Sequence, residues 1–427
     1  MNRGAVGRVV GRVGGAWVVA GLLAACGAPE GDTPVADSGV VHPARMPFPR
    51  EPGRRYFCDL PAPDVIQAGL PYGFCVRRFA GVRAPRVMAF APNGDLFVAS
   101  PAVRTPGGAP PGLGQIVVLS DDDGDGVATS TVFAAGLNDI HGLLFGQDGW
   151  LYYTRTDGVY RTAYTPGQRQ AGPGAAERVA DLAGLAPGPR WTHTLAQSRD
   201  GTIYVSQGQY GSFTCPSTPF AGAIFRVRAE ASGARPELVS AGFRNPMYLR
   251  CDPTGARCYA AELSDDAWHP RTGVLGREKL VLINPGEDYG YPCCAGPGDM
   301  APPGRTRTDC RAVTRELGTW PLHDTPFGID FERGRFPEPW RGGFFVGLHG
   351  AYGTWANTKV IWSPVDPATG HPTGQWRDFV TGWGVSAQGI RGRITDVVFG
   401  PDGRMFFSDD QGGGVYWVSP EPMAVPE

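Results

Sequence analysis

The sequence predicts an all-β fold: a six-bladed β-propeller with a Gly/Pro/Cys-rich insertion before the fifth repeat turn. Two observations support this prediction. The 427 residues include 63 glycines and 41 prolines while 42% of the chain is apolar, which is typical of short strands joined by many turns. A turn that ends in glycine and leads into an apolar, aromatic strand also recurs six times, as a ring of similar sheets requires.

Each copy of this repeat marks a β-hairpin. A four-stranded blade fits the spacing between copies, because each sheet then needs its neighbours to cover its faces. The longest interval contains the insertion, at about 288–319. The alternative is a β-sandwich with fortuitous turns. The six copies lie at residues 92–98, 147–153, 199–205, 253–259, 340–346 and 401–407.

The N-terminal residues 1–25 are predicted to be a signal peptide, because arginines precede the uncharged run 13–25, which is too short to span a bilayer. The run ends in Leu-Ala-Ala-Cys-Gly, which resembles the lipobox of bacterial lipoproteins, so we expect a lipid anchor through Cys26. The alternative is an ordinary signal peptide with an incidental cysteine. We expect a disordered tether, the propeller and a short tail at residues 26–53, 54–420 and 421–427.

Charge and cysteine content agree with an exported, membrane-anchored lipoprotein on the periplasmic or extracellular face. The 39 basic and 41 acidic residues nearly balance, which argues against a nucleic-acid partner. Apart from Cys26, eight of the nine cysteines remain, an even number that predicts disulfides in an oxidising compartment. The candidate pairs are Cys251 with Cys258, across a turn, Cys58 with Cys75, and Cys310 with Cys293 or Cys294.

The repeat register also predicts which side chains meet at one end of the propeller axis. The innermost strand of each blade should run into the repeat turn, so the residues just before it face the mouth of a central funnel. Arginines and histidines predominate there and suit a planar ligand with several negative charges. Alternatively, some arginines pair with carboxylates. The registered residues are Arg83, Arg86, Asn138, His141, Arg190, His193, Arg244 and Arg393.

Three aspartates form a second candidate site between two predicted strands. Asp121, Asp123 and Asp125 precede Gly126 in a DxDxDG run whose hard oxygen ligands suit calcium. An EF-hand would also require an acid at its twelfth position, where Val132 stands. A solvated acidic turn is therefore the alternative.

Residues from about 71 to 418 resemble the glucose/sorbosone dehydrogenase family of six-bladed quinoproteins, in its sorbosone-dehydrogenase-like branch. The most specific match is the sequence Gly-Phe-Arg-Asn-Pro at 242–246, similar to the family's G-x-RNP motif. Glu262 follows it, and then 285–292, similar to PGxNYGWP. Further matches are 323–328, 345–350 with His349, and Arg393 before the last repeat turn.

This resemblance implies pyrroloquinoline quinone (PQQ) over the axis, calcium beside it, a small sugar or polyol as substrate and an external electron acceptor. A histidine base would take a hydroxyl proton while hydride passes to the quinone. The resemblance places Ser264 and Asp265 where the family holds calcium. Its implied cofactor-binding residues are Arg190, Arg244, Asn245, Arg393 and His349.

One segment departs from the family pattern. This branch has HwTRTL where residues 190–195 are Arg-Trp-Thr-His-Thr-Leu, so Arg190, which cannot act as a base, takes the histidine position. We expect His193 to serve as the catalytic base, with His141 as the reserve candidate; otherwise the protein is a non-catalytic, ligand-binding propeller. A calcium-dependent, lactonase-like hydrolase is a further alternative. An axial cluster of carboxylates would favour the hydrolase, and a funnel lined by arginines would favour the quinoprotein.

Overall fold

The chain divides into two units, Met1–Met46 and Pro47–Glu427. The computed structural model describes only residues of the second, so the predicted signal peptide, Cys26 and most of the tether lie outside the described residues. The described residues are 51–65, 68–101, 112–172, 176–185, 190–209, 215, 220–228, 233–265, 277–300, 309–351, 354, 356–386, 389–390 and 392–426.

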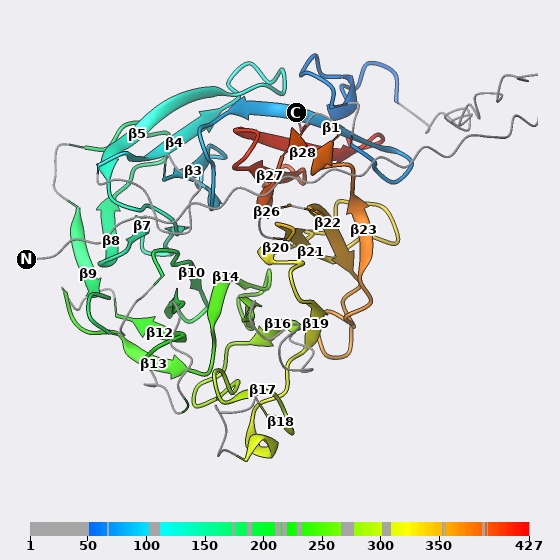
Figure 1. Ribbon diagram of the computed structural model, residues 1–427. Coiled ribbons are helices and arrows are strands. Elements are labelled where there is room, and N and C mark those ends of the chain that lie inside the picture. Colours follow the sequence, from blue (N-terminus) through cyan, green and yellow to red (C-terminus); the bar gives the residue numbers. More distant parts are fainter. Residues whose placement is uncertain are drawn as a thin grey trace, which may run out of the picture. The chain divides into compact units, whose positions relative to one another are not determined.

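Six four-stranded antiparallel sheets form the predicted blades (Figure 1). Blade 1 contains β2 (Met88–Phe90), β3 (Leu96–Ser100), β4 (Gly114–Ser120) and β5 (Thr129–Leu137). Blade 2 contains β6 (Leu143–Phe145), β7 (Trp150–Arg155), β8 (Gly158–Ala163) and β9 (Glu177–Asp181). Blade 3 contains β10 (Leu195–Gln197), β11 (Ile203–Gln207), β12 (Ala223–Val227) and β13 (Glu237–Ser240).

The remaining three blades follow the same order, except that the last borrows a strand from the start of the domain. Blade 4 contains β14 (Asn245–Cys251), β15 (Cys258–Leu263), β16 (Arg277–Leu282) and β19 (Gly318–Pro321). Blade 5 contains β20 (Pro326–Phe331), β21 (Phe344–Leu348), β22 (Lys359–Ser363) and β23 (Arg377–Val380). Blade 6 contains β26 (Ile394–Phe399), β27 (Met405–Asp409), β28 (Gly414–Pro420) and β1 (Phe74–Gly81).

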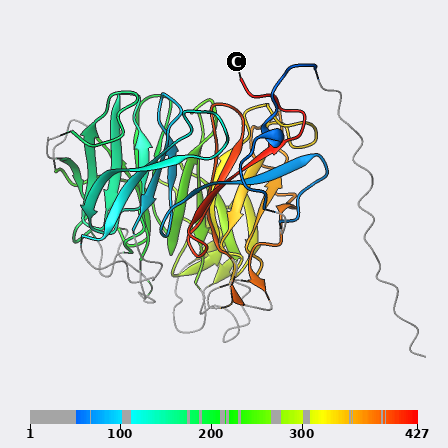
Figure 2. The same ribbon diagram turned by 90° about the horizontal axis from the view of Figure 1, so that it is seen from above.

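The six innermost strands close into a ring. In sequence order, β2, β6, β10, β14, β20 and β26 each contact the next, and β26 contacts β2. The strands run across the thickness of this ring (Figure 2). β1 completes blade 6 by pairing with β28 from Phe74↔Pro420 to Gly81↔Gly414, so the two ends of the domain are hydrogen-bonded together. The six-bladed propeller is therefore confirmed, and the β-sandwich alternative is excluded.

The repeat turns join the first and second strands of every blade, as predicted. Each turn glycine has a positive φ, for example 93° in Gly94 and 91° in Gly403. A residue with a side chain would adopt this backbone conformation only at a cost in free energy. All six innermost strands therefore begin at one end of the axis and reach their turns at the other. We call the end where they begin the upper mouth and the end where they finish the lower mouth.

The hydrophobic core lies between neighbouring blades. Both faces of the central strands are apolar, and aromatic rings cross from sheet to sheet. Phe345 of blade 5, for example, packs 5.1 Å from the Phe399 ring of blade 6. Because this apolar packing fills the spaces between the sheets, the axis itself is left to polar and charged side chains.

The insertion of blade 4 lies between β16 and β19 and contains β17 (Cys294–Gly296), β18 (Asp299–Met300) and the 3-10 helix η2 (Cys310–Ala312). The disulfides Cys58–Cys75 and Cys251–Cys258 confirm two predictions, and Cys310 pairs with Cys294. Sequence analysis missed Cys215–Cys293, which links the insertion to the chain after β11. Four disulfides agree with an oxidising compartment.

Two short elements complete the described fold: the 3-10 helix η1 (Phe57–Asp59) and the hairpin of β24 (Val385–Ser386) with β25 (Gly389–Ile390). Residues beyond β28 pair with the segment before η1, where the amide of Phe57 donates to the Met423 carbonyl at 3.2 Å. Over the described part of the chain, we find no helix with the length and apolar character needed to cross a membrane.

Candidate functional site

Every blade contributes a side chain to a buried cluster on the axis, directly below the upper mouth. Arg86 is central: its guanidinium carbon lies 5.7 Å from the Trp191 ring centre and 5.8 Å from that of Phe327. His141 packs edge to face on Trp191 at 5.4 Å and on Tyr248 at 5.8 Å. This axial cluster consists of Arg86, His141, Trp191, Tyr248, Phe327, His349, Arg393 and Asp410.

Asp410 holds the two arginines of the axial cluster. It accepts two hydrogen bonds from Arg393, at 2.6 and 2.7 Å, and pairs with Nη2 of Arg86 at 2.8 Å. The side chains of all three residues are at most 5% exposed. The alternative that some funnel arginines pair with carboxylates is therefore correct for Arg86 and Arg393. One carboxylate faces two guanidinium groups, so this part of the cluster carries net positive charge.

His349 lies beside this charged group, at the end of β21. Its ring stacks on Phe327 with centres 4.0 Å apart, and its Nδ1 donates to the Ile394 carbonyl at 2.7 Å. Burial, and then the positive charges of Arg393 and Arg86, lower the pKa of His349 well below its usual value. The imidazole is therefore neutral at pH 7.

The two candidate bases occupy different environments. His141 faces the axial cluster; its Nδ1 donates to the His193 carbonyl at 3.1 Å, and burial followed by the charge of Arg86 lowers its pKa to about 3. The His193 ring instead lies between blades 2 and 3. Its Nδ1 donates to the Ser206 carbonyl at 2.8 Å, and burial lowers its pKa although the nearby Asp157 favours its charged form.

Arg190, Arg244 and Asn245 meet where blades 3 and 4 adjoin at the upper mouth. Arg190 donates to the Gln209 carbonyl at 3.1 Å, and the amide of Gln209 donates to the Arg244 carbonyl at 2.9 Å. A Cβ on Gly208 would lie 2.1 Å from Oδ1 of Asn245 and 2.9 Å from Cδ of Arg190. Both side chains therefore cross the Gly208 backbone at a distance that requires glycine.

A buried acid supports this segment from below. Glu262 is fully buried and accepts a hydrogen bond from the amide of Arg244 at 2.9 Å. Burial raises its pKa, and Lys279, 3.7 Å away, opposes that rise. Within the described residues, Oδ1 of Asn245 and Oε2 of Glu262 are buried acceptors without a hydrogen-bond partner. This junction can therefore take up further donors or a cation.

The predicted calcium residues Ser264 and Asp265 follow β15 and are almost fully buried. Ser264 donates its hydroxyl proton to the Arg277 carbonyl, while its amide donates to Glu278 at 2.5 Å. Asp265 accepts a hydrogen bond from the Tyr291 hydroxyl at 3.1 Å. Their side chains thus attach the end of β15 to β16 and to the insertion, and their role in holding calcium stays a prediction.

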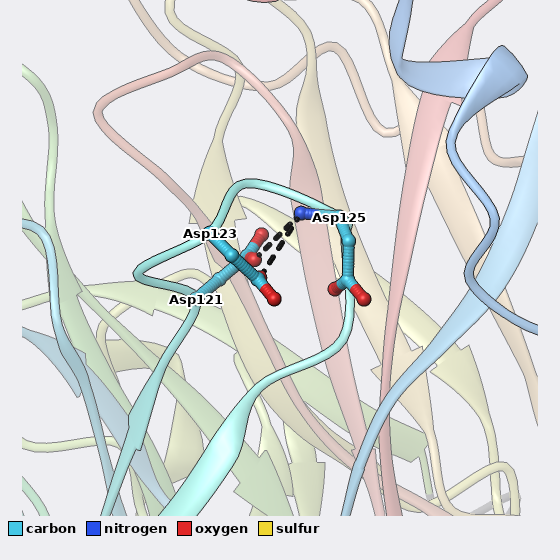
Figure 3. A group of neighbouring side chains, drawn as sticks. All are labelled: Asp121, Asp123 and Asp125. Carbon is cyan, nitrogen blue, oxygen red and sulfur yellow. Dashed lines mark hydrogen bonds between the residues drawn. The ribbon is translucent and has the colours of Figure 1, made fainter.

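The three aspartates of the DxDxDG run do come together, in the turn between β4 and β5 (Figure 3). Their ligand atoms lie within 4.8 Å of one another. The amide of Asp125 donates to Asp121 at 3.0 Å and to Asp123 at 3.4 Å, so the turn already uses part of this acceptor capacity. The strand directions place the turn at the lower end of blade 1, away from the upper mouth.

No second group of this kind occurs in the described ranges, on the axis or elsewhere. The axial carboxylate cluster expected of the hydrolase alternative is thus absent from the residues that the structure describes. Sequence analysis also missed Asp410, Trp191, Tyr248 and Phe327. Trp191 and Phe327 carried a usable signal, since both stand in segments already matched to the family. Asp410 and Tyr248 could be placed only from the strand register.

The sequence profile of the Glucose / Sorbosone dehydrogenase family matches residues 82–417. The chain belongs to this family. It is also 26% identical over 407 residues to the uncharacterized protein slr1608 of Synechocystis, covering 82% of this chain and 87% of that protein.

Two solved structures show the same fold. One is the calcium structure of the Trichoderma reesei carbohydrate-active enzyme of family AA12, with a TM-score of 0.66, 19% identity and coverage of 84% of this chain and 98% of that one. The other is the holo form of the PQQ domain of pyranose dehydrogenase from Coprinopsis cinerea, with a TM-score of 0.65, 20% identity and coverage of 87% and 100%. Membership of the glucose/sorbosone dehydrogenase family supports a sugar oxidoreductase.

Proposed function

We propose that the protein is a PQQ-dependent dehydrogenase that oxidises a hydroxyl group of an aldose or similar polyol and passes the electrons to an external acceptor. The observation that carries the proposal is the meeting of Arg190, Arg244 and Asn245 at the upper mouth. PQQ is planar and carries three carboxylates, which suit guanidinium donors. Family membership and the PQQ domain of the Coprinopsis cinerea neighbour support the same choice.

The residues present fit such a cofactor. Arg190 and Arg244 are half-buried, which strengthens their attraction for an anion relative to fully exposed arginines. Gly208 lets Arg190 and Asn245 lie against the backbone, whereas Arg393 and His349 belong to the buried axial cluster below the mouth. When bound, PQQ supplies the hydride acceptor. The chain's own residues would hold its carboxylates and exclude water from beneath it.

The sequence leaves two candidates for proton removal, and the geometry favours His141 over His193. With its Nδ1–H fixed on a carbonyl, His141 presents a neutral Nε2 lone pair beside the axial cluster. That Nε2, like the Nε2 of His193, is buried and has no hydrogen-bond partner among the described residues, so the direction of the ring decides between the two. His193 is turned between two blades. We therefore propose that His141 accepts the hydroxyl proton and that Arg190 stabilises the developing alkoxide.

We propose calcium at the end of β15, near Ser264 and Asp265. The carboxylate of Asp265 and that of Glu262 on β15, which also faces Lys279, supply the hard oxygens that calcium prefers.

We also propose that Cys26 is acylated and anchors the exported protein to a membrane, since the disulfides indicate an oxidising compartment. Membrane fractionation of wild type and Cys26→Ser tests this anchor. The serine variant should move to the soluble fraction, and a wild type that is already soluble would contradict the proposal.

The central experiment adds PQQ and calcium chloride to purified apoprotein. Calorimetry measures PQQ binding, and dye reduction with a panel of aldoses and polyols measures oxidation. Binding with sugar-dependent reduction supports the dehydrogenase. An absence of PQQ binding in the presence of calcium contradicts it.

A second candidate function, a binding propeller without redox activity, is favoured by one observation. Arg190 occupies the family's histidine position, and both candidate bases are completely buried. This candidate predicts that PQQ or a similar anion binds but that no sugar reduces it. Activity gained in Arg190→His would then identify the exchanged residue as the cause.

A further inference from the structure

A second cavity opens at the lower mouth, on the opposite end of the axis from the proposed cofactor site. Its volume is about 430 Å³, within the range of roughly 300–1,000 Å³ that small-molecule sites occupy. All six blades line it, through residues at the ends of the innermost strands and in the repeat turns. Representative lining residues are Met88, Leu143, Leu195, Arg250, Asp330 and Val398.

The axial cluster separates this cavity from the upper mouth. Arg86 and Tyr248 belong to that cluster, and Met88 and Arg250 lie two residues further along the same strands. Side chains two residues apart in a strand lie on the same face. Arg86 and Tyr248 therefore face the cluster, while Met88 and Arg250 lie on the same side but nearer the lower mouth, at the cavity. A ligand here would therefore occupy a site of its own.

The carboxylates that line the cavity already have their donors. Asp330 accepts from the amides of Phe331 and Phe399, each at 2.8 Å, and also from Arg333. Asp252 accepts from backbone amides of its own turn and from Arg257 at 3.2 Å. Every carboxylate oxygen of these two acids therefore already accepts a hydrogen bond from the protein.

The arginines of the cavity differ in this respect. Arg250 uses Nε on the Ile329 carbonyl at 3.0 Å, but its Nη2 lies 3.8 Å from the nearest oxygen of Asp396, beyond hydrogen-bond distance. The side chain of Arg250 is 25% exposed. Over the described ranges, the guanidinium of Arg199 has neither a hydrogen-bonded nor an ion-paired partner, and its residue is exposed. The two arginines therefore have donors available, whereas the two acids already accept hydrogen bonds.

Arg199 lies in the repeat turn of blade 3, and Arg250 lies near the end of β14 in blade 4. The amide of Arg199 donates to the Gly255 carbonyl at 2.9 Å, and a Cβ on Gly255 would lie 2.8 Å from that amide nitrogen. This close approach joins the repeat turn of blade 3 to that of blade 4, next to the end of the strand that carries Arg250. The remaining walls are mixed, because Gln147, Gln197 and Thr254 line them together with apolar residues.

We propose that the lower mouth binds a small organic carboxylate. Its oxygens would take hydrogen bonds from Arg250 and Arg199, and its body would lie in the cavity beside Gln147 and Gln197. This site is separate from the proposed cofactor site, so its test requires neither PQQ nor calcium.

Calorimetry on the full chain tests the proposal with three probes at low ionic strength. Benzoate offers an apolar body, gluconate a hydroxylated body, and benzamide lacks the charge. We expect saturable binding of at least one carboxylate, with benzamide at least tenfold weaker than benzoate if benzoate binds. Which of the two carboxylates binds identifies the body that the walls accept.

Three variants localise that binding. Arg250→Gln should weaken it by roughly tenfold to 100-fold, the effect of losing a charge-assisted hydrogen bond, and Arg199→Gln by a smaller factor. Arg228→Gln is the matched control on blade 3, because Arg228 is exposed and pairs with Glu237 instead. If Arg250→Gln does not fold, the carboxylate affinity of Arg199→Gln, a variant at an exposed position, tests the proposal instead. Carboxylate affinities weaker than about 10 mM, or affinities unchanged in both cavity variants, overturn the proposal.

Discussion

The two mouths of the propeller use arginine in opposite ways. Below the upper mouth, Arg86 and Arg393 share Asp410 and are nearly sealed from solvent by aromatic rings. At the lower mouth, Arg250 approaches Asp396 and Asp330 only to 3.8 and 3.9 Å and stays partly exposed. Guanidinium groups that share a buried carboxylate are held within the structure, whereas Arg250, whose carboxylates lie beyond hydrogen-bond distance, is the one we propose to contact a ligand.

The largest expected effect is on the sealed side of this comparison. Asp410→Asn leaves two buried guanidinium groups without their counter-charge, so we expect the free energy of unfolding to fall by about 3–5 kcal/mol. Urea unfolding measures it. The control is Asp378→Asn, whose exposed carboxylate pairs with Lys359 and should matter little. If Asp410→Asn and Asp378→Asn have the same free energy of unfolding, the structural role that we assign to Asp410 is wrong.

The second prediction concerns the partly open arginines of the upper mouth. If Arg244 makes a charge-assisted contact with a carboxylate of PQQ, Arg244→Ala should weaken PQQ binding by roughly 2–5 kcal/mol. Titration calorimetry with calcium present measures the change. Arg341→Ala, at an exposed arginine paired with Glu338, should bind PQQ like the wild type. Unchanged binding in Arg244→Ala would place the cofactor elsewhere.

The third prediction separates the two candidate bases. If the wild type oxidises sugar, His141→Ala should lower turnover roughly 100- to 10,000-fold, because a general base contributes about that much. His193→Ala should lower it less, since its ring lies between blades 2 and 3. Steady-state dye reduction decides between them. A larger loss in His193→Ala would reverse our assignment and restore the base expected from sequence.

The fourth prediction is a pH dependence beside the lower mouth. Burial raises the pKa of Asp396 to about 7 in the folded protein, against the nearby charge of Arg250. The folded state therefore binds the proton more tightly than the unfolded chain does, and this contribution to stability is lost as pH rises from about 4 to 7. Unfolding free energies between pH 4 and 8 should show that loss in the wild type and a flatter profile in Asp396→Asn. Parallel profiles would contradict the raised pKa.

Local patterns explain why so much of the fold is predictable from the sequence. Each repeat turn requires a glycine with positive φ, and each is followed by an apolar strand, so the blade register is visible in the sequence. The same register places Arg190, Arg244 and Asn245 together at one mouth. Cys251 and Cys258 are paired correctly because a short turn separates them.

Contacts between distant segments cannot be predicted in this way. Cys215 and Cys293 are 78 residues apart, and β1 reaches β28 across almost the whole domain. The orientation of the two histidines is equally inaccessible, because strand spacing places a residue at the mouth without saying whether its ring turns toward the axis or between blades.

By itself, the sequence determined the number of blades, the position of their turns and the gathering of basic residues at one end of the axis. These properties depend on backbone conformation and on the alternation of apolar residues, which neighbouring residues specify. Only the tertiary structure decided which arginines are already paired with a buried carboxylate. Asp410 satisfies Arg86 and Arg393 because closing the ring brings blade 6 beside blade 1, whereas Arg250 keeps unused donors because its carboxylates stop short of it. Whether a buried charge is paired depends on distances between blades, and the fold alone sets those distances.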